Sequence, residues 1–86
     1  MPRKKTLEKA IRHYGSKNQI TKSIEEMAEL IRALTRDDTQ NIMEEIADVH
    51  IMITQLRLIF DSQQIDDMIT QKLKRLESRI ERGNSR

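Results

Sequence analysis

The sequence has no cysteine, no tryptophan, one tyrosine, one phenylalanine, one proline and two glycines among its 86 residues. Without cysteine the chain forms neither disulfides nor thiolate metal sites, which fits a reducing, cytoplasmic compartment. A run of about eighteen apolar residues is also missing, so we expect no membrane partner. Few aromatic side chains can stack on bases and the net charge is only +2, so we expect no nucleic-acid partner.

The scarcity of glycine and proline leaves little to interrupt helices, and the alternation typical of strands does not occur. Apolar residues at helical spacing predict helices over about residues 6–14, 19–35, 38–60 and 63–82. Gly15 suits the end of the first helix, and Asp38 or Thr39 suits the start of the third. Because the connections are short, the sequence predicts an all-α, four-helix, up-down bundle.

One domain is expected over residues 1–86, with a flexible basic arm at 1–5 and a flexible tail at 83–86. A chain this short has a marginal core of its own. Apolar stripes predict the core faces of the second, third and fourth helices: Ile20, Ile24, Met27, Ile31, Leu34; Ile42, Ile46, Val49, Ile53, Leu56, Phe60; Ile65, Ile69, Leu73, Leu76, Ile80. The third helix is apolar on its far side as well, which favours a homodimer or homotetramer.

Acidic residues are concentrated in the middle of the chain, where nine acids but only three bases lie between residues 25 and 61. Glu26 with Glu29, and Glu45 with Asp48, form two pairs with the same spacing of three residues. Residues three apart are neighbours on a helix surface, so two antiparallel helices would bring both pairs together. Clustered carboxylates repel one another, and a hard divalent cation such as Mg²⁺ offsets that repulsion.

A simpler interpretation stays open for these acids. Ser23 and Glu26 match a capping box, and solvated acid pairs are common on helix surfaces. Iron chemistry is disfavoured, because His13 and His50 do not have the spacing of a di-iron carboxylate bundle.

The paired motifs, Glu-Glu-x-x-Glu from Glu25 and Glu-x-x-Asp from Glu45, resemble the signature of MazG-type all-α nucleoside triphosphate pyrophosphohydrolases. The resemblance covers roughly residues 7–82. It implies hydrolysis of a nucleoside triphosphate between the α and β phosphates, giving the monophosphate and pyrophosphate. It also implies Mg²⁺, with Mn²⁺ as a substitute, on four ligands: Glu26, Glu29, Glu45 and Asp48.

The resemblance implies further roles around the metal. Glu25 is either the residue that orients or deprotonates the attacking water or a solvated neighbour. Gln19 either contacts the base or sugar or caps the second helix. Basic residues of the fourth helix are implied to bind the phosphates: Lys72, Arg75 and Arg79. Many relatives have an asparagine shortly before the matching lysine, where this chain has Thr70 and Gln71, so that substrate contact is not expected here.

Two other functions remain open from the sequence. One is the related hydrolysis of phosphoribosyl-ATP. The other is a helical interaction module without catalytic activity, in which the acid pairs are merely solvated.

Overall fold

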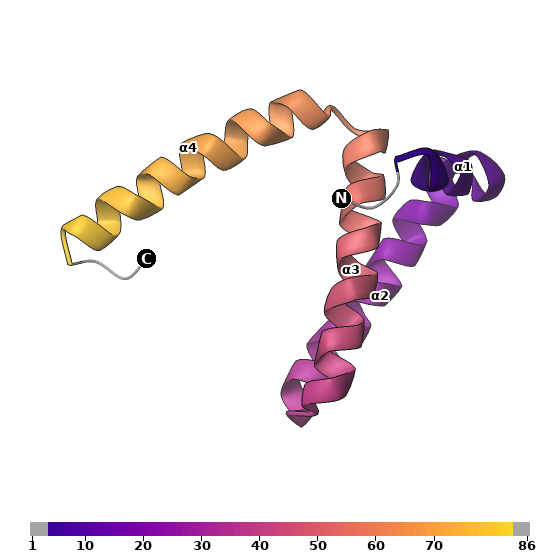
Figure 1. The fold of residues 1–86 in the computed structure, drawn as a ribbon, viewed down its shortest axis with the longest axis horizontal. Helices are drawn as coiled ribbons and strands as arrows, with labels where there is room; N and C mark the ends of the chain where they lie inside the picture. Colours follow the sequence, from indigo (N-terminus) through magenta and orange to yellow (C-terminus); the bar gives the residue numbers. More distant parts are fainter. Residues whose placement is uncertain (1–3, 84–86) are drawn as a thin grey trace.

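A computed structural model describes residues 4–83. Within this range the chain forms four helices and no strand, which confirms the all-α fold class (Figure 1). The helices are α1 (Lys4–Tyr14), α2 (Ser16–Arg36), α3 (Thr39–Ile59) and α4 (Ser62–Glu81). Lys4 and Lys5 belong to α1, although an arm was expected there, and the remainder of the predicted arm and most of the predicted tail lie outside the described residues.

The helices are separated by very short turns. Gly15 alone separates α1 from α2, and its φ of 91° lies in a region that glycine adopts without steric cost. Asp37, with a φ of 55°, ends α2 in the left-handed conformation. Asp38, one of the two predicted caps, then caps α3, because its side chain accepts a hydrogen bond from the Asn41 backbone N–H at 3.3 Å.

Helices α2 and α3 form an antiparallel pair, and α1 packs across one end of this pair (Figure 1). Two small residues of α2, Ser23 and Ala33, are almost completely buried and allow the α3 backbone to approach closely. Leu7 of α1 and Met52 of α3 are also buried. This small core therefore fixes α2 and α3 side by side, which is the arrangement that the acidic pairs need.

Helix α4 leaves the other three helices and extends away from them (Figure 1). It contacts α3 near their junction, and among the described residues it makes no contact with α1 or α2. The radius of gyration is 15.6 Å, whereas a compact chain of this length has about 12 Å. The up-down arrangement thus extends through α2 and α3, and α4 does not lie alongside them in the single chain.

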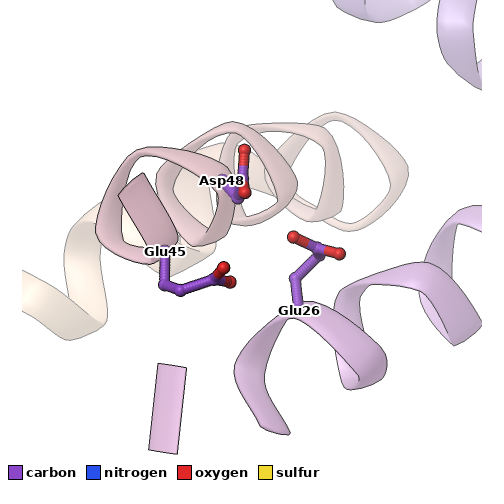
Figure 2. Close-up of side chains that lie close together, drawn as sticks. All are labelled: Glu26, Glu45 and Asp48. Atoms are coloured by element: carbon purple, nitrogen blue, oxygen red, sulfur yellow. The ribbon is translucent and has the colours of Figure 1, made fainter. Parts of the chain in front are cut away.

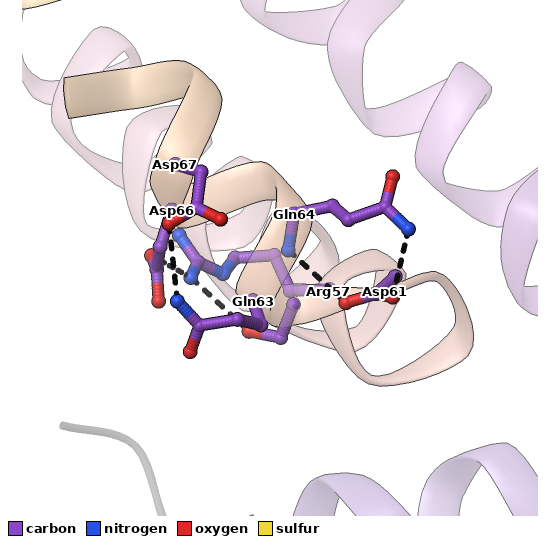
Figure 3. A network of polar contacts seen from close by, with 7 residues as sticks. Arg57, Asp61, Gln63, Gln64, Asp66 and Asp67 are labelled. Carbon is purple, nitrogen blue, oxygen red and sulfur yellow. Dashed lines mark hydrogen bonds and ion pairs between the residues drawn. The ribbon is translucent and has the colours of Figure 1, made fainter. Parts of the chain in front are cut away.

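Polar contacts fix the direction in which α4 begins (Figure 3). Arg57 of α3 donates a hydrogen bond to Ser62 Oγ at 3.1 Å and forms an ion pair with Asp66. Asp61 caps α4 by accepting from the Gln64 backbone N–H at 3.0 Å, and this bond lowers the pKa of the Asp61 carboxyl. The departure of α4 is therefore anchored by specific contacts.

Many of the predicted core residues are exposed in the single chain: Ile24, Ile31, Leu34, Ile46, Ile53, Phe60, Ile69, Leu73, Leu76 and Ile80. The prediction that these apolar stripes face the core of the single chain was wrong. In α2, a different row of side chains packs against α3. That row contains Gln19, Ser23 and Ala33, each of which is buried. None of the helices in residues 4–83 has the length and apolar character required to cross a membrane.

Candidate metal centre

Three of the four predicted ligands meet between α2 and α3. One carboxylate oxygen from each of Glu26, Glu45 and Asp48 lies within 4.8 Å of the others (Figure 2). Glu26 comes from α2, and the other two come from successive turns of α3. The capping-box interpretation of Ser23 and Glu26 is wrong, because α2 begins at Ser16 and the Ser23 hydroxyl donates to the Ile20 carbonyl inside the helix at 2.6 Å.

Glu45 has the least favourable environment of the three. Its Oε2 atom is buried and has no hydrogen-bond partner among the described residues. Desolvation is the largest cause that raises the pKa of Glu45, followed by repulsion from Asp48 and Glu26. Because a buried acceptor without a partner is costly, this oxygen is a strong candidate for binding a cation.

The raised pKa makes the stability of the metal-free protein depend on pH. The folded protein holds the Glu45 proton more tightly than the unfolded chain does. The bound proton therefore stabilises the folded protein at pH values below the ordinary pKa of a glutamate. This stabilisation is lost as the pH rises through the raised pKa of Glu45. With a chelator present to keep the protein free of metal, we expect the thermal unfolding midpoint to fall as the pH rises through this pKa. The fall should occur in the wild type and in Glu44→Gln, but not in Glu45→Gln. An identical pH profile for Glu45→Gln would contradict the assigned environment.

Glu29 and Glu25 lie outside the group of three. Glu29 Oε1 is 2.9 Å from Arg32 Nη1, although its charge is close enough to contribute to the raised pKa of Glu45. Glu25 lines a separate, larger cavity. The structure therefore brings Glu29 to the edge of the site, with one of its carboxylate oxygens paired with Arg32.

Two cavities adjoin each other at the site. The smaller, about 280 Å³, is lined by Glu26 and Asp48 together with Lys22, Ile51 and Met52. The larger, about 610 Å³, lies among α1, α2 and α3, and its lining residues include Tyr14, Gln19, Lys22, Glu25, Met52 and Gln55. Because Lys22 and Met52 line both, the carboxylates lie beside a cavity large enough for a small organic group.

Gln19 is buried against α3 and does not cap α2. Its Nε2 donates a hydrogen bond to Gln55 Oε1 at 2.7 Å, and Gln55 Nε2 contacts Met52 Sδ at 3.6 Å. Lys22, Met52 and Gln55 also line the cavities at the site, although they were not predicted as site residues. The spacing could have indicated them. Lys22 precedes Glu26 by one helical turn, and Met52 and Gln55 lie on the same face of α3 as Glu45.

The basic residues predicted to bind phosphate are not brought to this site in the single chain. Lys72, Arg75 and Arg79 lie on α4, which has no described contact with α2, and none of them lines either cavity. His50 lines a different cavity, near the α3–α4 junction.

The donor set fits a hard divalent cation. All three groups are carboxylates, which are the ligands that Mg²⁺ prefers, and one of their oxygens is buried without a partner within residues 4–83. A positive ion between them removes the mutual repulsion and gives that oxygen a partner.

Comparison with known proteins identifies a family for nearly the whole described chain. The model of one protein family, described as the MazG nucleotide pyrophosphohydrolase domain, matches residues 15–82. The match includes both acidic motifs and all the predicted site residues. Comparisons with curated proteins and with solved structures gave no significant match.

Proposed function

The chain belongs to the MazG nucleotide pyrophosphohydrolase domain family, and we propose that it hydrolyses nucleoside triphosphates to the monophosphate and pyrophosphate with Mg²⁺ as cofactor. The observation that supports this proposal most directly is the convergence of Glu26, Glu45 and Asp48, together with a buried Glu45 oxygen that has no partner in the described part of the chain. A cytoplasmic location, expected from the lack of cysteine, is consistent with such an activity.

The three carboxylates would hold the cation, and Glu29 is the fourth proposed ligand because it lies at the edge of the group. Bound Mg²⁺, or Mn²⁺ in its place, neutralises phosphate charge and lowers the pKa of a bound water. The ligands have to be ionised for this purpose, and the raised pKa of Glu45 means that acidification weakens metal binding at Glu45 earlier than at an ordinary glutamate.

Glu25 is the proposed residue that orients or deprotonates the water. It is exposed and precedes Glu26, and it lines the larger cavity, so it faces the space beside the carboxylates and not the group itself. The variant Glu25→Gln separates this role from metal binding, because a water-activating residue lowers kcat when removed while Mg²⁺ affinity is retained.

The nucleoside is proposed to occupy the larger cavity. Tyr14 offers an aromatic ring there, and the amides of Gln19 and Gln55 offer donors and acceptors for a base or sugar. The hydrogen bond between the two amides holds Gln19 in place, which suits a group that has to discriminate among substrates.

A homodimer or homotetramer is the proposed functional state. In the single chain, Leu73 is 58% exposed and Ile69 is 41% exposed on α4, and α3 exposes Ile46 and Met43. Large apolar side chains left exposed in rows on helices are typical of surfaces that another subunit covers. Packing a second copy of the chain against α4 would also bring the three basic residues of α4 close to bound phosphates, which they do not reach within the single chain.

A substrate screen tests the activity. Common and modified nucleoside triphosphates are incubated with the protein and Mg²⁺, and pyrophosphate and monophosphate are measured. We expect both products in equal amounts from at least one triphosphate. Turnover of phosphoribosyl-ATP alone would favour the related pathway enzyme, and no turnover with no Mg²⁺ binding would favour the non-catalytic module.

A further inference from the structure

Lys22 lies between the two parts of the proposed site. It precedes Glu26 by one turn of α2, and its Nζ is 3.4 Å from Glu26 Oε1. The same side chain lines both the cavity beside the carboxylates and the larger cavity beside Gln19. The ammonium is therefore placed at the boundary between the proposed metal and nucleoside positions.

The ion pair between Lys22 and Glu26 is easily broken. The Lys22 side chain is 55% exposed, so water competes for its ammonium, whereas the Glu26 side chain is only 16% exposed. The lysine also precedes the glutamate by four residues, which is the weaker of the two orders for such a pair on a helix. A divalent cation among the carboxylates would repel the ammonium and replace it as the partner of Glu26.

A triphosphate at this site has more negative charge than one divalent ion neutralises, so its phosphates need a second cation. The bases of α4 do not supply it in the single chain, because none of them lines either cavity. Lys22 lines both, and a lysine has a flexible stem that lets its charge move over several ångströms.

We propose that Lys22 is a phosphate-binding residue of the site, which neutralises Glu26 in the metal-free protein and moves to the phosphate chain when metal and nucleotide bind. This inference rests on the proposed function and names a residue for it that lies on α2. Glu26 and the phosphates compete for the one ammonium of Lys22. A lysine that only pairs with Glu26 and a lysine that also binds phosphate therefore predict different effects on nucleotide affinity.

The test compares Lys22→Met with Lys22→Arg, using Lys17→Met as the matched control on an exposed part of α2 that lines neither cavity. Two affinities are measured by calorimetry: that of Mn²⁺ alone, and that of a non-hydrolysable nucleoside triphosphate at saturating Mg²⁺. In Lys22→Met we expect Mn²⁺ to bind about threefold more tightly, because a competing positive charge is gone. We expect the nucleotide to bind at least about tenfold more weakly, because a charge-assisted contact is lost.

Lys22→Arg should keep nucleotide affinity within about threefold of the wild type, since it retains the charge. Opposite shifts of the two affinities in Lys22→Met, with neither shift in Lys17→Met, support the inference. Unchanged affinities, or two shifts in the same direction, overturn it. If Lys22→Met matches Lys17→Met while Glu45→Gln abolishes turnover, the proposed function stands and the role of Lys22 is wrong.

Discussion

Replacing Glu45 by glutamine is expected to lower metal-dependent pyrophosphate release by at least about 100-fold. The Glu45 carboxylate lies beside those of Glu26 and Asp48, and its Oε2 atom is buried with no partner among the described residues. An amide is nearly the same size but has no charge, so the substitution removes a proposed ligand without opening a cavity. Initial rates at saturating nucleotide over a range of Mg²⁺ concentrations measure the effect.

Glu44→Gln is the matched control for this substitution. It makes the same chemical change at the preceding residue, which is exposed and outside the group of three. We expect it to keep nearly full turnover. Helical circular dichroism should be the same in both variants, and Glu45→Gln should unfold at a higher temperature than the wild type without metal, since repulsion is relieved. Equal turnover in the two variants would show that Glu45 is not a ligand.

Replacing Leu73 by glutamate is expected to dissociate the proposed oligomer and to remove most of its activity. Leu73 lies in the middle of the apolar stripe of α4, which the single chain leaves uncovered. A charge buried without a partner in an apolar interface costs several kcal/mol, which weakens association by about 100-fold or more. Sedimentation over a range of protein concentrations measures the association constant directly.

The control for the α4 substitution is Gln71→Glu, which adds the same charge on the opposite side of that helix. It should leave association close to that of the wild type. A wild-type protein that remains monomeric at high micromolar concentration would contradict the proposed interface. So would a Leu73→Glu variant that associates as strongly as Gln71→Glu.

The helices and the meeting of the acidic pairs could be predicted from the sequence because both depend on local spacing. Gly15, Asp38 and the scarcity of other breakers set the helix ends within a few residues. Glu26 with Glu29, and Glu45 with Asp48, have the same spacing, which indicated a pair of acids on one face of each of two consecutive helices. Short connections then forced α2 and α3 to run antiparallel, and this brought three carboxylates together.

The features that sequence reasoning missed depend on which neighbour a side chain meets. The apolar stripe of α2 suggested a core face, yet α2 packs through Ser23 and Ala33 because small residues allow the closest helix contact. The direction of α4 follows from Arg57 binding Ser62 and Asp66 across a turn, which periodicity does not reveal. Glu29 has the right spacing, but a nearby arginine competes for its carboxylate.

Binding of Mn²⁺, followed by electron paramagnetic resonance, tests most directly whether Glu26, Glu45 and Asp48 share one divalent ion. The wild type is titrated with Mn²⁺ and compared with Glu26→Gln, Glu45→Gln and Asp48→Asn, with Glu44→Gln as the control. The shared site predicts that each of the three variants loses at least about tenfold in affinity while the control does not. Wild-type affinity in all three variants would contradict it.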